Sequence, residues 1–151
     1  MDRFFMFIAT GAYSGFLPKA PGTWGSSVGV LLWLLLGRLD LLPFLSVIGM
    51  LFVVGVFSAG AAEKILDRGD PPQVVVDEIV GQLIALIAVP FQPGPVVLSF
   101  LLFRFFDILK PFPIGWIDRH LHGGLGIMLD DIIAGLYTLL ILQLGFRFYG
   151  I

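Results

Sequence analysis

Acidic side chains stand at the edges of several apolar segments of this chain. The five that are placed in this way are Asp77, Glu78, Asp107, Asp130 and Asp131. A single Asp at a helix start is commonly a cap, because its carboxylate accepts hydrogen bonds from free backbone N–H groups. Adjacent acids repel each other and are costly at a membrane edge, so capping does not explain a pair that occurs twice. If the five carboxylates converge, they form an oxygen-ligand site for Mg²⁺, and a purely structural role is the alternative.

Basic residues accompany these acids at helical spacing. Arg104 and Lys110 each stand three positions from Asp107, so a helix would make them its neighbours. An ordinary ion pair between Arg104 and Asp107 is the structural alternative. Asp118 and Arg119 follow in what we expect to be a loop. Because Arg presents a fork of donors to phosphate and Lys a point charge, carboxylates and cations together favour metal-assisted phosphoryl transfer.

Two segments rich in glycine offer further contacts. The segment 14–26 contains Lys19 and Thr23, and its backbone N–H groups near a helix start could bind an anion. It lacks the Gly-Lys-Ser/Thr order of a Walker A loop, and an ordinary connector is the alternative. The segment 122–126 is expected to be a flexible turn near a ligand. His120 and His122 are two apart, which is wrong for a helical metal pair, so we expect loop or interfacial roles for them.

The composition indicates what kind of molecule must position these residues. Of 151 residues 58% are hydrophobic, and only 9 basic and 11 acidic residues are present, with a mean hydropathy of +0.98. These values point to an integral membrane protein with a single domain over residues 1–151. The net charge of −2 argues against nucleic-acid binding. The absence of Cys excludes disulfides, thiolate zinc sites and a cysteine nucleophile.

Three apolar segments are candidates for membrane spans. Residues 41–62 carry no charge, and as a helix they would extend about 33 Å. Residues 132–146, opened by the acidic pair, form the last span. Residues 24–36 are shorter and could cross obliquely. The expected fold is therefore an all-α integral membrane protein, a small helical bundle with about three full spans.

A short helical hairpin completes the expected bundle. Residues 79–91 and 96–106 are each too short to cross a bilayer alone. Residues 92–95, Gln-Pro-Gly-Pro, should form the turn between them. The pair then enters and leaves on one side, or consists of two core helices covered by the spans.

The basic residues indicate the orientation of this bundle. Arg38 and Arg147 fall on one face of the expected layout. The other face carries Arg3, Lys19, Lys64, Arg68, Arg104, Lys110 and Arg119. Because cytoplasmic loops are enriched in Lys and Arg, we expect the active site at the cytoplasmic membrane face.

The sequence resembles the phosphatidylglycerophosphatase A family, the Mg²⁺-dependent phosphatases of bacterial phospholipid synthesis. The blocks that carry the resemblance, in family order, are Gly15–Ser26, Asp77–Gly81, Phe103–Pro113, Asp118–Arg119 and Gly123–Gly135. Phe112 stands where Trp is common, and Leu129 precedes the acidic pair, but every ionisable position is intact. The resemblance covers most of the chain.

The resemblance implies an all-helical fold and hydrolysis of the terminal phosphate of phosphatidylglycerophosphate to give phosphatidylglycerol. It places the chain in the bacterial inner membrane as a multi-pass protein among membrane lipids, with homo-oligomerisation undecided. The metal candidates are Asp77, Glu78, Asp107, Asp130 and Asp131. The catalytic candidates are Asp77, Arg104, Asp107, Lys110 and Asp131. The candidates for phosphate binding are Lys19, Thr23, Arg104, Lys110 and Arg119.

Mechanism and rival functions stay open at this point. Mg²⁺ would polarise the phosphate while one carboxylate activates water for in-line attack, and an aspartyl-phosphate intermediate is the competing route. The Asp-x-Asp-x-Thr/Val nucleophile pattern is missing, which favours water. The runs typical of CDP-alcohol phosphatidyltransferases and of histidine-nucleophile lipid phosphatases are also missing. Outside enzymes, the alternative is a small cation-binding membrane transporter or subunit, which acids in the middles of the long spans would favour.

Overall fold

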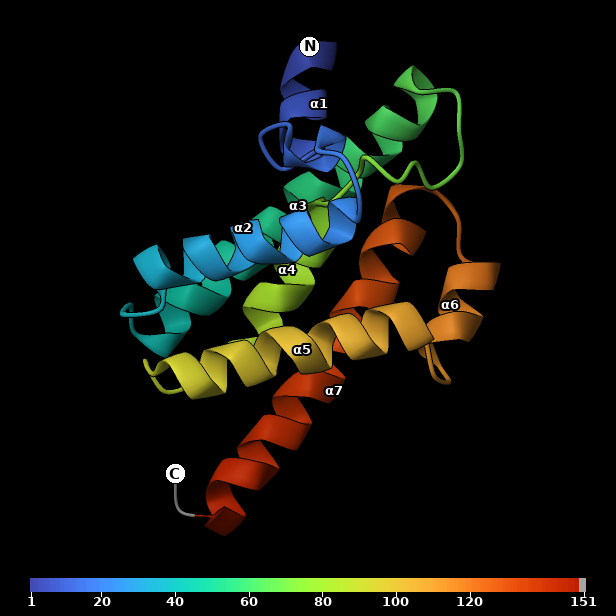
Figure 1. The fold of residues 1–151 in the computed structure, drawn as a ribbon. Helices are drawn as coiled ribbons and strands as arrows, with labels where there is room; N and C mark the ends of the chain where they lie inside the picture. Colours follow the sequence, from blue (N-terminus) through green and yellow to red (C-terminus); the bar gives the residue numbers. More distant parts are fainter. Residues whose placement is uncertain (150–151) are drawn as a thin grey trace.

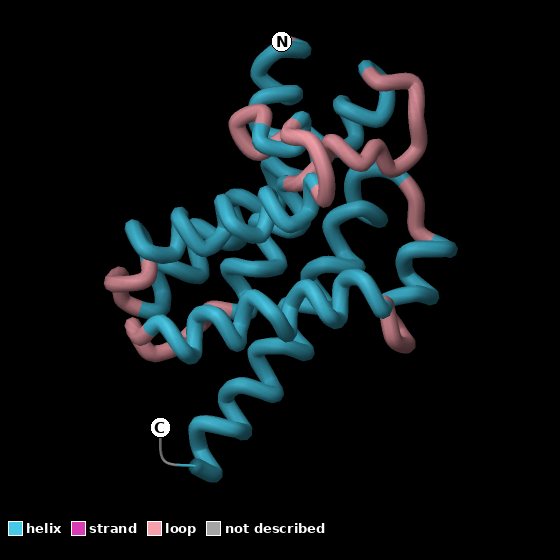
Figure 2. Tube along the Cα trace, viewed as in Figure 1, coloured by secondary structure: helices cyan, strands magenta, loops and turns pink. Residues whose placement is uncertain are grey.

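A computed structural model describes residues 1–149, and within that range all regular structure is helical (Figure 1). The loops gather mainly at two ends of the bundle (Figure 2). The elements are α1 (Asp2–Ala9), a 3₁₀ turn η1 (Ser14–Phe16), α2 (Pro21–Leu36), α3 (Leu41–Ile65), α4 (Val76–Ala85), α5 (Pro93–Leu109), α6 (Ile114–His120) and α7 (Gly123–Tyr149).

Helix α4 lies at the centre of the bundle and packs against α2, α3, α5 and α7. Residues 79–86 are all buried, as expected for a helix that is apolar on nearly every side. Gly81 lets α7 approach closely, because a Cβ atom there would lie 2.6 Å from the carbonyl oxygen of Asp131. The crossing of α4 and α7 thus brings the N-terminal half of α7 against the central helix.

Two helices are long and apolar enough to cross a membrane, namely α3 and α7. The 25 residues of α3 correspond to about 38 Å of helix, more than a bilayer core needs. Helix α2 has 16 residues, or about 24 Å, which is shorter than a typical span. Of the three expected full spans, length and composition therefore support two, and the third stays a prediction.

The hairpin is present, but the prediction of its turn was wrong. Helices α4 and α5 run in opposite directions, and the chain reverses over residues 86–92 rather than 92–95 (Figure 1). Pro93–Pro95 form the first turn of α5. Proline is tolerated there because its missing N–H is not needed in the first helical turn.

The prediction that the acidic pair opens the last span was also wrong. Helix α7 begins at Gly123, so Asp130 and Asp131 lie about two turns inside it. The glycines before them are helical, where a flexible turn was expected. Gly124 packs directly on α3, where a Cβ would lie 2.7 Å from the backbone nitrogen of Gly60. Gly124 therefore allows the close packing of α7 on α3.

The end of the bundle away from these acids is closed by aromatic and amide contacts. Trp33 of α2 stacks on Phe91, with 4.1 Å between ring centroids. The guanidinium carbon of Arg38 lies 5.4 Å from the centroid of the same Phe91 ring. Gln143 of α7 donates hydrogen bonds to the carbonyl oxygens of Ile87 and Ala88, at 3.0 and 3.3 Å. These contacts fix the turn between α4 and α5.

Candidate active site

The first turn of α4 supplies two buried acids, Asp77 and Glu78. Neither acts as a helix cap, because α4 begins after Val75 with no side-chain capping hydrogen bond. Both carboxylates lie near the positive end of the helix dipole, which favours negative charge. Asp77 Oδ1 and Glu78 Oε2 are buried without a hydrogen-bond partner. Unpartnered buried carboxylate oxygens are costly, so this position is built for something other than stability.

Helix α7 adds a third acid to this pair. Asp131 is only 2% exposed, and its Oδ2 atom also has no partner. One carboxylate oxygen each from Asp77, Glu78 and Asp131 lies within 4.8 Å of the others. Three convergent oxygen ligands with free lone pairs are the donor set that hard divalent cations prefer. We call these three residues the acidic cluster.

Burial raises the pKa of both acids on α4. The pKa of Asp77 lies well above its usual range because the group is buried, and the charge of Glu78 adds to that shift. Burial likewise raises the pKa of Glu78 to about 8, with the charges of Asp131 and Asp107 adding and that of Arg104 opposing. The protein alone therefore does not offset the cost of burying the negative charges of Asp77 and Glu78. A bound cation would favour the charged forms of both carboxylates.

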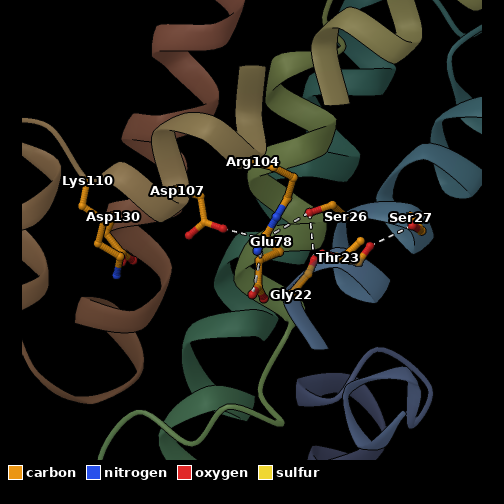
Figure 3. A network of polar contacts seen from close by, with 9 residues as sticks. All are labelled: Gly22, Thr23, Ser26, Ser27, Glu78, Arg104, Asp107, Lys110 and Asp130. Carbon is orange, nitrogen blue, oxygen red and sulfur yellow. Dashed lines mark hydrogen bonds and ion pairs between the residues drawn. The ribbon is translucent and has the colours of Figure 1, made fainter. Parts of the chain in front are cut away.

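Helix α5 brings a guanidinium to the edge of the acidic cluster (Figure 3). Arg104 Nη1 lies 2.5 Å from Asp107 Oδ2 and 3.9 Å from Glu78 Oε1. The same nitrogen lies 3.4 Å from the hydroxyl oxygen of Ser26 on α2, while Arg104 Nε has no partner. The neighbour relation of Arg104 and Asp107 expected from their spacing is confirmed. Arg104 thus links α5 to α4 and α2, and its Nε–H group remains free to donate a hydrogen bond.

Gly22 of α2 makes room for this guanidinium. A Cβ atom at Gly22 would lie 2.7 Å from Arg104 Nη1 and would also collide with the carboxylate of Glu78. Any larger residue would push the Arg–Glu contact apart. Because Gly22 has no side chain, the backbone of α2 lies directly against the Arg104 guanidinium and the Glu78 carboxylate.

Lys110 ends α5 and joins a different set of acids than expected. Asp107 and Lys110 line the same cavity, but the ion pairs of the described residues join Asp107 to Arg104 and Lys110 to other acids. Lys110 is the C-cap of α5, in the left-handed region with φ of 44°. Its Nζ lies 2.6 Å from Asp130 Oδ2 and 2.5 Å from Asp118 Oδ1. Burial lowers the pKa of Lys110, but the two carboxylates outweigh it and leave the pKa above its usual value.

The charged groups surround one cavity of about 340 Å³ between α2, α4, α5, α7 and the loop before α4. A second cavity of about 280 Å³ lies beside it, and Asp70 and Asp130 line both. Seven of the ten candidates from the sequence line the first cavity: Asp77, Glu78, Arg104, Asp107, Lys110, Asp130 and Asp131. Its size and charge suit a phosphate-bearing group.

The other three candidates do not line either of these cavities. Lys19 is exposed, and Thr23 accepts a hydrogen bond from Ser27 at its backbone oxygen. Arg119 donates from Nε to the carbonyl oxygen of Gly115, 2.7 Å away. The expectation of a loop at residues 118–119 was wrong, since both residues belong to α6.

Reasoning from the sequence missed two residues of the site, Gly22 and Asp70. Gly22 had a signal, because Gly22, Gly25 and Gly29 recur at the spacing of one helix face. Asp70 had none, since it stands in a loop before two prolines. His120 is exposed, stacks on Trp116 and contacts the Trp116 carbonyl oxygen through Nδ1 at 2.8 Å, while His122 lines only the second cavity.

Most of the chain matches one known protein family. Residues 7–146 match the family model described as Phosphatidylglycerophosphatase A. A protein of that name from Haemophilus influenzae is 40% identical over 136 residues, covering 89% of this chain and 83% of its own. The protein of that name from Escherichia coli is 38% identical over 132 residues, covering 87% and 77%.

The name of a third relative refers to a different substrate. The protein from Bacteroides thetaiotaomicron is 38% identical over 148 residues, covering 91% of each chain, and is provisionally named a phosphatidylinositol-3-phosphatase. No solved structure matches the chain significantly.

Proposed function

The chain belongs to the phosphatidylglycerophosphatase A family, and from that premise we propose that it hydrolyses the terminal phosphate monoester of phosphatidylglycerophosphate to phosphatidylglycerol. The observation that carries the proposal is the polar cavity. Three carboxylates, each with one oxygen that lacks a hydrogen-bond partner, line this cavity together with Arg104 and Lys110, at one end of a bundle of apolar helices. A lipid with a phosphate head group has the matching distribution of charge and hydrocarbon.

The acidic cluster fits Mg²⁺. Asp77, Glu78 and Asp131 would hold the ion through the oxygen atoms that have no partner in the protein. When bound, the ion supplies charge neutralisation and Lewis acidity at the phosphate oxygens. Asp130 is directed to Lys110 and Asp107 to Arg104, which leaves these two as positioning residues rather than primary ligands.

The cations and the remaining acids have separate tasks. Arg104 binds and orients the phosphate with the donors that Asp107 and Glu78 leave free, and Lys110 adds a second positive charge. A carboxylate of the cavity accepts a proton as water attacks phosphorus, a bond from the water oxygen to phosphorus forms, and the bond to the glycerol oxygen breaks. The leaving oxygen takes up a proton, and the products are phosphatidylglycerol and inorganic phosphate.

Direct water attack and an aspartyl-phosphate intermediate predict different stereochemistry. With a chiral, isotopically labelled phosphate, one in-line displacement inverts the configuration at phosphorus, and two successive displacements retain it. We expect inversion. Retention would contradict direct attack and assign a carboxylate of the cavity as nucleophile.

A membrane arrangement of this bundle is part of the proposal. We place α3 and α7 across the inner membrane of a bacterium, with α2 as a third, shorter crossing and the cavity toward the cytoplasm. Lys64 at the end of α3 and Lys110 at the end of α5 lie at the cavity end, and Arg38 and Arg147 lie at the other. This distribution agrees with the enrichment of cytoplasmic loops in basic residues.

The experiment is phosphate release in mixed micelles. The intact chain should release inorganic phosphate from phosphatidylglycerophosphate with Mg²⁺ and lose that activity in EDTA. Phosphatidylinositol 3-phosphate is the competing substrate, because of the name of one relative. Absence of release from phosphatidylglycerophosphate by a folded chain would contradict the proposal.

The alternative, a small cation-binding transporter or subunit, is not favoured. Its acids should continue along the spans, but α3 carries no acid before Glu63, and those of α7 stand in its N-terminal third. The acids meet cations at one end instead of forming a path.

A further inference from the structure

We infer that an apolar groove between α2 and α5 holds an acyl chain of the lipid whose phosphate occupies the polar cavity. This inference rests on the proposed function. The groove has a volume of about 340 Å³ and is lined by Ser27, Val30, Leu31, Val96, Val97 and Phe100. Its one polar side chain is already satisfied, since the Ser27 hydroxyl donates to the Thr23 carbonyl oxygen at 2.7 Å. The groove therefore offers hydrocarbon contact and no free polar group.

The groove lies on the same pair of helices as the polar cavity, although the two share no lining residue. Helices α2 and α5 lie side by side in opposite directions (Figure 1). Gly22 and Arg104 belong to the polar cavity, and the contact of Ser26 with Arg104 stands at its edge (Figure 3). The groove begins one residue further on α2, at Ser27, and one helical turn before Arg104 on α5, at Phe100. Phe100 and Arg104 are four positions apart, so they lie on one face of α5, and about one turn, or about 5.4 Å, separates the apolar section from the charged one.

The position of the apolar groove beside the polar cavity indicates which kind of molecule binds there. A molecule that fills both sections needs a phosphate at one end and hydrocarbon at the other, which is the chemistry of a phosphorylated glycerolipid. Leu31 and Val97 are largely exposed at the open side of the groove, so an acyl chain can enter sideways from the membrane. An arbitrary bilayer lipid without a phosphate monoester lacks the anchor at Arg104 and should occupy the groove more weakly.

The groove therefore makes hydrolysis depend on the acyl chain as well as on the head group. The acyl chain enters from a membrane or micelle, where its methylenes are already out of water, so the groove adds packing contacts rather than a transfer from water. A substitution that displaces about two methylenes removes several of these contacts and should reduce the preference for a long-chain substrate over a short-chain one by about threefold.

The test compares two neighbouring substitutions on α5. Val97→Trp fills the groove, whereas Leu98→Trp places the same side chain on a position that does not line it. Both sites are surface positions, 56% and 47% exposed, so neither substitution disturbs the core. The measured quantity is the ratio of kcat/KM for dioleoyl and dihexanoyl phosphatidylglycerophosphate. We expect about a threefold fall in this ratio for Val97→Trp and the wild-type ratio for Leu98→Trp. Equal ratios in all three proteins would overturn the inference.

Photo-cross-linking tests the groove without any substitution. Phosphatidylglycerophosphate with a diazirine on its acyl chain should label residues 96–100 and 27–31 of the wild-type chain, and a phosphatidylcholine with the same chain should label them much less. Equal labelling by the two lipids would overturn the inference. If the wild-type chain released no phosphate, the proposed function would be wrong, and the cross-linking comparison would still decide the occupant of the groove.

Discussion

The two ends of the bundle differ in whether their buried polar groups have hydrogen-bond partners. At the turn between α4 and α5, Gln143 donates to two backbone carbonyl oxygens, and Trp33 and Arg38 cover the ring of Phe91. At the other end of the same helices, oxygens of Asp77, Glu78 and Asp131 are buried without partners. Buried polar groups are normally hydrogen-bonded, so the incomplete end is the one prepared for a ligand. The complete end stabilises the fold.

The largest loss of activity is expected from Asp131→Asn at the incomplete end. The substitution keeps the shape of the side chain but removes a charge that a cation needs. Phosphate release should therefore fall more than about 100-fold, which is beyond the usual effect of changing a residue that only orients a metal ligand. Because one of three crowded carboxylates is gone, the melting temperature without Mg²⁺ should stay equal or rise. Phosphate release and thermal unfolding in detergent measure both. A variant that keeps its activity, or that loses activity only by unfolding, would contradict this role.

A smaller loss is expected from Arg104→Lys. Lysine keeps the positive charge but cannot contact Asp107, Glu78 and a phosphate with one planar fork. Activity should fall about 10- to 100-fold, as for groups that orient a metal site. The assay is phosphate release with Arg147→Lys as the matched control, since Arg147 lies near the far end of α7 and is exposed. Equal activity of both variants would mean that Arg104 is only a structural ion pair.

Trp33→Ala tests the complete end. Trp33 is 2% exposed, and its removal leaves a cavity beside Phe91, which should lower the free energy of unfolding by about 3 to 5 kcal/mol. The activity of the folded molecules should change little, because the groups of the cavity are untouched. Leu34→Ala, at a position 48% exposed, is the control and should remain close to wild type in stability. Loss of activity per folded molecule in Trp33→Ala would show that the two ends are coupled.

The smallest effect is expected from Arg119→Ala. Arg119 is exposed, and its Nε donor is used by Gly115 within α6. Phosphate release should stay within about threefold of wild type, in line with surface substitutions away from a site. A loss comparable to that of Arg104→Lys would place Arg119 on the substrate after all, and would require α6 to move when lipid binds.

The charged residues of the incomplete end could be predicted from the sequence, but their pairing could not. Acids and bases at membrane edges are costly, so Asp77, Glu78, Asp107 and Asp131 stood out by position alone. The partners of Lys110 depend on a left-handed residue at the end of α5, which periodicity does not encode. The depth of Asp130 and Asp131 in α7 depends on Gly124 packing against α3. Both are tertiary effects that override local pattern.

We expect Asp77, Glu78 and Asp131 to bind one divalent cation together. Mn²⁺ prefers the same oxygen ligands as Mg²⁺ and can be counted by electron paramagnetic resonance, because free and bound ions give different signals. The purified chain should bind one Mn²⁺ that Mg²⁺ displaces, and the folded double variant Asp77→Asn/Asp131→Asn should bind none at the same concentration. A wild-type chain without bound Mn²⁺, or a double variant that binds it equally well, would contradict the account.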